Sequence, residues 1–261
     1  MKKLLINTAA AALLLSSPVY AGLVDITFGG IDPGDGSVLT SSLTSGGYND
    51  GSGIFWEDFD TDQGCGFTQL DAVNNFGAGV TGSYSLTTGL TSGQAAPPAG
   101  DTTCYLVTPE LYGNTPGSVD FGLYPLLTSG ISGIQIDYLG IYWGSIDGTS
   151  NNMDSLTLFD QDGNVIVTEF GDSIDGDEIL AKFNGQSGNQ QSDLTNIYVN
   201  FNMSGAARFN NFSLSSSGKA LEVDNIVARV VVPVPEPSTL AIFALGVIGL
   251  ASRQFNFKKQ S

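Results

Sequence analysis

The sequence predicts an all-β protein: an antiparallel β-sandwich or jelly-roll-like domain with an N-terminal signal peptide and a single C-terminal transmembrane helix. Two observations predict the domain. Short runs rich in β-branched and aromatic residues recur, separated by clusters of Gly, Asn, Asp, Ser or Pro. No stretch before the tail has a sustained helical period. Many strands at short spacing, with no helices between them, are typical of sandwiches and jelly rolls.

The first 21 residues are typical of a signal peptide. Lys2 and Lys3 precede an apolar run from residue 4 to 15, and small residues follow at the positions that a signal peptidase inspects. Cleavage is therefore expected between Ala21 and Gly22. A retained membrane anchor is the alternative, but the apolar run is shorter than the roughly 20 residues of a membrane span.

The domain is predicted to cover residues 22–232, because Pro233 and Pro235 end the last strand and begin a stiff spacer. A hairpin is expected where SLTLF and VIVTEF flank DQDGN, with its turn at Asp162-Gly163. One short helical turn is expected within 173–183. The other strand candidates begin at residues 24 (VDITF), 53 (GIFWEDF), 104 (CYLVT), 133 (GIQIDYLGIYW) and 196 (NIYVNF).

The two cysteines, Cys65 and Cys104, predict a disulfide, because an even cysteine count in an oxidising compartment favours pairing. Metal ligation and a redox pair are the alternatives. Neither has support, since the chain lacks both the CxxC spacing and histidine.

Acidic residues dominate the exported part. Between residues 22 and 235 there are 25 acidic and 4 basic residues, a net charge of −21. Such a field repels nucleic acid and anionic membrane surfaces, so neither is an expected partner. We interpret the acidity mainly as a means of solubility, with binding of divalent cations as the alternative.

Two groups of aspartates are the calcium candidates. The first begins like a calcium loop, but Gln63 and Gln69 stand where the EF-hand pattern needs Gly and Glu. Oxygen-rich loops can bind Ca²⁺ without that pattern, so both groups remain candidates. Their members are Asp58, Asp60 and Asp62 in the first group, and Asp172, Asp175 and Asp177 in the second.

No catalytic constellation is visible, and we expect no enzymatic activity. Without histidine, a Ser-His-Asp or Cys-His arrangement cannot form. Paired carboxylates could hydrolyse glycosides, but candidates such as Glu57 or Glu110 have nothing that distinguishes them.

Three aromatic residues could instead stack on sugar rings: Trp56, Tyr142 and Trp143. Strand geometry places Tyr142 and Trp143 on opposite faces, so at most one of them is expected to be buried. An exposed aromatic ring on a concave sheet face would favour a carbohydrate-binding module.

The tail, residues 233–261, has three parts. The triplet Pro235-Glu236-Pro237 is rigid and extended, and Ser238 can cap a helix. A transmembrane helix of about 20 residues, roughly 30 Å long, is expected at about 238–257. Basic residues close the tail and place its end in the cytoplasm by the positive-inside rule. These are Arg253, Lys258 and Lys259.

The sequence of this tail resembles the PEP-CTERM sorting domains: VPEPSTLA is followed by a Gly-containing apolar segment and Arg253. The resemblance implies recognition near Pro235, Glu236 and Pro237 by an exosortase, a membrane peptidase of bacteria with an extracellular-polysaccharide system. Arg253 is isolated here, whereas family members commonly cluster arginines.

Two segments of the domain, YLGIYWGSID from Tyr138 and ALEVDNIVAR from Ala220, are similar to parts of exosortase-dependent surface proteins. Those families imply a β-rich surface domain and no activity. The expected protein is thus structural or adhesive, with a precursor anchored in the inner membrane before it reaches the cell surface or matrix. Its expected partners are an exosortase and exopolysaccharide.

Overall fold

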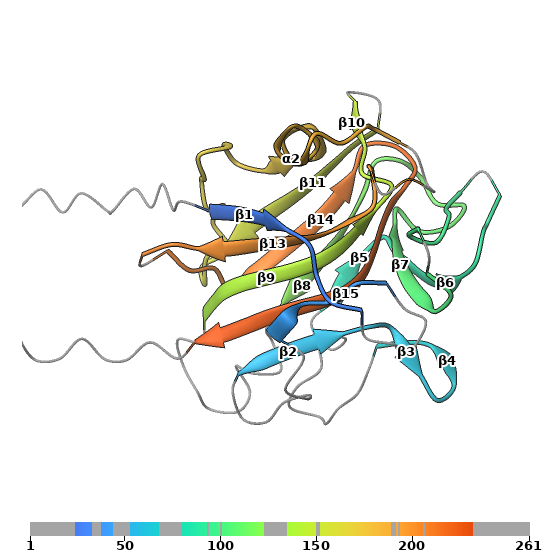
Figure 1. Ribbon diagram of the computed structural model, residues 1–261, viewed down its shortest axis with the longest axis horizontal. Coiled ribbons are helices and arrows are strands. Elements are labelled where there is room, and N and C mark those ends of the chain that lie inside the picture. Colours follow the sequence, from blue (N-terminus) through green and yellow to red (C-terminus); the bar gives the residue numbers. More distant parts are fainter. Residues whose placement is uncertain are drawn as a thin grey trace, which may run out of the picture.

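The computed structural model describes residues 24–231 except 33–37, 44–52, 68–79, 93, 100, 123–134, 150–151, 189–191, 193 and 206. This part of the chain consists of antiparallel strands and one short helix, which confirms the all-β prediction (Figure 1). The predicted signal peptide with its cleavage site and the predicted transmembrane helix lie outside the described residues. Within these ranges, no helix is long and apolar enough to cross a membrane.

The larger sheet has seven strands, and its last strand in sequence, β15, lies in its middle (Figure 1). The order is β1 (Val24–Phe28), β13 (Ile197–Met203), β9 (Gln135–Gly144), β15 (Leu221–Val231), β7 (Cys104–Thr108) and β6 (Ser85–Thr88), with β2 (Ile54–Glu57) also paired to β15. β1 and β7 coincide with the predicted strands VDITF and CYLVT.

The smaller sheet has six strands. Its order is β10 (Gly148–Thr149), β11 (Asn152–Phe159), β14 (Asn211–Ser216), β8 (Gly117–Gly122) and β5 (Val80–Gly82), with β12 (Ile174–Asp175) also paired to β11. A separate short hairpin is formed by β3 (Asp60–Thr61) and β4 (Gly64–Cys65).

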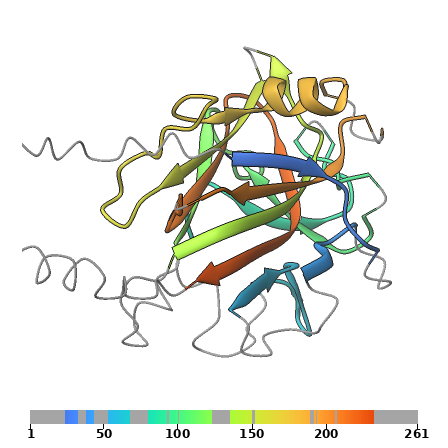
Figure 2. The same ribbon diagram turned by 60° about the vertical axis from the view of Figure 1, so that its left-hand side comes forward.

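The two sheets share one hydrophobic core. Trp143 from β9 and Leu156 from β11 belong to the same buried cluster, and so does Ile179 from helix α2 (Gly176–Phe183). The ring of Phe183, the last residue of α2, lies 5.1 Å from that of Phe28 in β1. The helix therefore links the smaller sheet to the edge of the larger one (Figure 2).

The larger sheet is also buried on the face that points away from this core. The Tyr142 hydroxyl donates to the Ala99 carbonyl at 3.3 Å, and Tyr142 packs with Val38 and Tyr198. Tyr142 and Trp143 do point to opposite faces, but only 5% and 0% of their surfaces are exposed. The prediction that at most one would be buried is wrong, because loop segments cover the second face.

A bulge interrupts β15 at the point where its second neighbour changes. β15 pairs with β7 up to Val223 and with β2 from Ile226 onward. Between them, Asn225 has a φ of +46°, its side-chain oxygen accepts the Trp56 indole N–H at 3.0 Å, and its amide donates to the Val38 carbonyl at 2.8 Å. Asn tolerates this left-handed conformation better than most residues.

The predicted hairpin and helical turn are both present. Phe159 forms a bridge to Val165 across a turn in which Gly163 has a φ of +80°. The second arm, however, forms this one bridge rather than a strand. The expected helical turn is the eight-residue helix α2.

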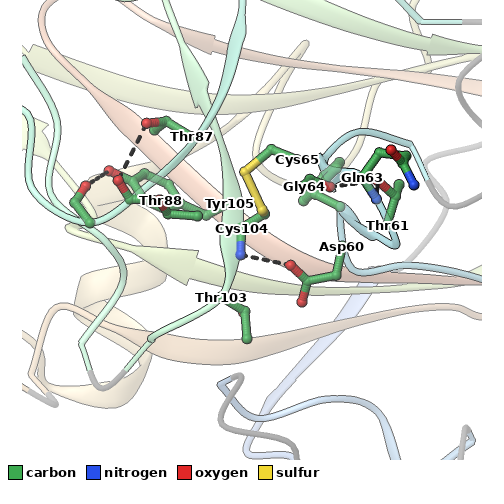
Figure 3. Close-up of a disulfide and its surroundings, with 12 residues drawn as sticks. Asp60, Thr61, Gln63, Gly64, Cys65, Thr87, Thr88, Thr103, Cys104 and Tyr105 are labelled. Atoms are coloured by element: carbon green, nitrogen blue, oxygen red, sulfur yellow. Dashed lines mark hydrogen bonds between the residues drawn. A yellow bond between two sulfur atoms is a disulfide. The ribbon is translucent and has the colours of Figure 1, made fainter.

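Cys65 and Cys104 form a disulfide with a Cα–Cα distance of 5.4 Å, as predicted (Figure 3). It joins the β3–β4 hairpin to the first residue of β7. The side chain of Asp60 strengthens this connection, because its carboxylate accepts the Cys104 N–H at 3.0 Å.

Cys65→Ser should lower the free energy of unfolding by up to about 4 kcal/mol, because the unfolded chain regains the freedom of a loop of about 40 residues. Cys104→Ser should cost more, since Cys104 is buried and its replacement places a hydroxyl there. Urea titration of both variants measures this. If both match the oxidised parent protein, the disulfide has no stabilising role.

Candidate functional sites

The first group of calcium candidates lies at the β3–β4 hairpin, and two of its members hold the local backbone. The Asp58 carboxylate accepts the Asp60 N–H at 3.2 Å, and Asp60 accepts the Cys104 N–H. Asp62 is exposed in the hairpin turn. These bonds give Asp58 and Asp60 structural roles.

The second group lies at the start of helix α2. Asp175 is the N-cap residue, and the Glu178 carboxylate accepts its backbone N–H at 2.9 Å, as in a capping box. Asp177 lies in the first turn, where a negative charge stabilises the helix.

Over the described ranges, no three Asp, Glu, Cys or His side chains gather closely enough to hold a metal ion. Calcium binding by Asp58, Asp60, Asp62, Asp172, Asp175 or Asp177 stays a prediction.

A buried carboxyl group, Asp154, lies on β11 and forms two hydrogen bonds with Asp147 in the segment between β9 and β10. Its carboxylate accepts the Asp147 N–H at 2.9 Å, and its own N–H donates to the Asp147 carbonyl at 3.0 Å. None of its surface is exposed. Burial raises the pKa of Asp154 to about 8, with a smaller contribution from the Asp147 charge, although the Asp147 N–H, the Ser216 hydroxyl and the Trp143 indole N–H oppose the rise.

A second fully buried carboxyl group, Glu222, lies on the face of β15 that points away from the shared core, opposite Val107, and accepts the Ala96 N–H at 3.2 Å. Burial raises its pKa well above the usual range, and the charges of Asp154 and Asp147 add to the rise. The pKa of Asp147 is also raised by burial, while a hydrogen bond from the Ser187 hydroxyl lowers it.

Strongly raised pKa values are common among catalytic acids, but those acids face a cleft. Asp154 and Glu222 have no exposed surface, so we interpret them as structural groups.

The glycosidase candidates Glu57 and Glu110 are also unlike a catalytic pair. Glu57 is buried and its carboxylate accepts the Phe59 N–H, whereas Glu110 is exposed. Asp154 and Glu222 were not among the sequence-based candidates. The only signal for Glu222 was a carboxylate inside the apolar run LEVDNIVA.

The aromatic residues proposed for sugar stacking are not exposed on a sheet face. Trp56 is partly buried and donates to Asn225, and Tyr142 and Trp143 are in the interior. Tyr112, which the sequence analysis did not single out, has 77% of its surface exposed. It lies in the loop after β7.

Asp154→Asn should flatten the pH dependence of stability. The folded-state pKa of Asp154 exceeds the unfolded value, so its stabilising contribution is complete below pH 4 and is lost as the pH rises toward about 8. The total is on the order of 5 kcal/mol. Asn is isosteric with Asp and uncharged. The melting temperature of the Asp154→Asn variant should therefore fall less between pH 5 and 8 than that of the parent protein.

Asp160→Asn is the matched control, because hydrogen bonds from Asn164 lower the pKa of this hairpin carboxyl and its titration lies below that window. Equal slopes for Asp154→Asn and the parent protein would show that Asp154 does not titrate there.

The sorting residues Pro235, Glu236 and Pro237 lie outside the described residues, and here comparison with known proteins is informative. Residues 233–254 match the family model of the PEP-CTERM protein-sorting motif. No curated protein sequence matches the chain.

One solved structure with some similarity is the crystal structure of the enzymatically active domain of tailspike protein 4 from bacteriophage CBA120. The identity is 15% and the TM-score 0.32, over 59% of this chain and 20% of that one. This chain therefore spans about a fifth of the tailspike chain, and the likeness is too low to define its fold. The informative match is the one at the C-terminus: this protein carries a PEP-CTERM motif, which implies export and exosortase-dependent sorting to the cell surface.

Proposed function

We propose that this chain is a structural or adhesive protein of the bacterial cell surface or extracellular matrix, anchored in the inner membrane by its tail until an exosortase processes it. The observation that carries the proposal is the PEP-CTERM match at residues 233–254, which begins two residues after β15 ends at Val231. Only three residues of sequence, 232–234, thus separate the last strand from Pro235.

The folded domain favours a passive role. We infer that the two sheets with their shared core form a β-sandwich, and the net charge of −21 between residues 22 and 235 keeps such a domain soluble at a crowded surface. The strongly shifted carboxyl groups Asp154 and Glu222 are sealed in the interior. A non-catalytic protein is therefore the better proposal.

The processing step can be tested in the native host by replacing Pro235, Glu236 and Pro237 with alanine. The full-length variant should accumulate in the inner membrane, because the recognition triplet is lost while the apolar segment remains. Cell fractionation shows where the variant accumulates, and intact-mass analysis shows whether its tail has been removed. The parent protein in a host that lacks the exosortase is the comparison.

Asn256→Ala with Gln260→Ala is the matched control, because both residues belong to the tail but lie beyond the matched segment. This control should be processed as the parent protein is. The proposal fails if the triple alanine variant is trimmed normally and still reaches the surface.

Calcium should have no specific effect on stability if the acidity is only a surface property. The melting temperature should then rise equally in calcium, magnesium and sodium chloride at matched ionic strength, because all three screen the same repulsion. A large rise in calcium alone, abolished by Asp60→Asn or Asp175→Asn, would instead establish a calcium site by mass action.

A further inference from the structure

Tyr112 combines an exposed aromatic ring with an unfavourable backbone conformation. Its φ is +62°, in the left-handed region that residues with a Cβ atom rarely adopt, and 77% of its surface is exposed. Its side chain forms no hydrogen bond or ring contact with any described residue. The next residue is Gly113, which could adopt this conformation without the penalty.

The loop that carries Tyr112 is held firmly from beneath. Leu111 packs against the buried cluster of Tyr105 and Val107, and its N–H donates to the Ser85 hydroxyl at 2.9 Å. The Glu110 N–H donates to the Ser83 hydroxyl at 3.2 Å. The ring is therefore presented on a fixed support rather than on a loose loop.

Gln94, from the neighbouring loop between β6 and β7, completes this support. Its side-chain oxygen accepts the Tyr112 N–H at 3.0 Å and also a hydrogen bond from the Lys219 ammonium group. The same loop carries Leu90, with 71% of its surface exposed. Gln94 and Lys219 thus lie beside Tyr112 at one end of the larger sheet, whereas Leu90 follows the opposite end of β6, where Thr88 pairs with Cys104.

The Tyr112 end of the larger sheet lies opposite the end at which β15 finishes with Val231. Thr108 at the end of β7 pairs with Leu221, the first residue of β15, and β15 then runs through 11 residues to Val231. At about 3.3 Å per residue, roughly 30 Å separate the two ends. β1 also starts on the side where β15 ends (Figure 1).

We propose that Tyr112 is the stacking platform of a binding site for a neutral polysaccharide. The ring offers an apolar face for the C–H face of a pyranose. Gln94 and Lys219 are held beside the Tyr112 backbone by the hydrogen bonds just described, and the exposed Glu110 precedes it by two residues, so these polar side chains offer partners for hydroxyl groups. A neutral chain fits better than a polyanion, because the domain carries a net charge of −21. A protein partner would need a larger contiguous apolar surface than the exposed ring of Tyr112.

The inference rests on the proposed surface location only for its biological setting, since binding in vitro requires no sorting. A failure of the alanine triplet experiment and a failure of binding are therefore distinguishable.

Affinity electrophoresis of the full chain in mild detergent tests the site. The probes in the gel are dextran, hydroxyethyl cellulose and the neutral fraction of the native host's own extracellular polysaccharide, with alginate as the polyanion. We expect at least one neutral probe to retard the protein and alginate not to. Tyr112→Gly should weaken that binding at least about tenfold, whereas Tyr112→Phe should retain it.

Stability separates a binding role from a structural one. Tyr112→Gly should leave the melting temperature unchanged or raise it, because glycine adopts a positive φ freely. Val167→Ala, which truncates another exposed apolar side chain, should bind as the parent protein does. Three results would overturn the proposal. The Tyr112→Gly variant could be less stable than the parent protein, or it could bind the polysaccharide as tightly as the parent does. The parent protein could also bind no neutral probe, whether or not it binds alginate.

Discussion

Strands β9 and β15 pair over almost their whole length, and the rest of the domain is arranged around this pair. One side of β15 is occupied by β9, and the other is shared between β7 and β2. Between these two partners β15 is interrupted at Asn225, which has a positive φ and forms hydrogen bonds with Trp56 and Val38. The two segments that resemble other surface proteins, from Tyr138 and Ala220, are largely these two strands.

The charge of the domain is distributed in an unusual way. Most carboxylates are outside and repel one another, yet Asp154 is buried on β11 of the smaller sheet and Glu222 is buried on the face of β15 that points away from the shared core. Burying a carboxyl group is costly unless it is protonated or well bonded. Each of these groups accepts a backbone N–H from a loop, Asp147 in one case and Ala96 in the other. These two bonds fix two loops against the sheets. Because both carboxyl groups are buried, they also make the free energy of unfolding depend on pH.

Local patterns in the sequence predicted the local structure well. The β-branched and aromatic residues of VDITF predicted β1, the turn chemistry of Asp162-Gly163 predicted the hairpin, and the cysteine count predicted the disulfide. The burial of Tyr142 could not be predicted in this way, because it depends on segments near Val38 and Ala99 that are distant in sequence. For the same reason, Asp60 and Asp175 resembled cation ligands in the sequence, while in the fold one holds Cys104 and the other caps a helix. The stacking residue Tyr112 stood in a loop with no periodic pattern to mark it.

The position of β15 has a consequence for biogenesis. A chain that is exported from its N-terminus threads its strands outward in sequence order, and the strand at the centre of the larger sheet comes last. Until Val231 has emerged, β9, β7 and β2 lack their common neighbour, so the sheet exists only as separate fragments. The domain can therefore complete its folding only after the residues directly before the PEP-CTERM motif have been exported. The last strand that the sheet needs and the sorting signal are neighbours in the chain, so one follows the other by two residues.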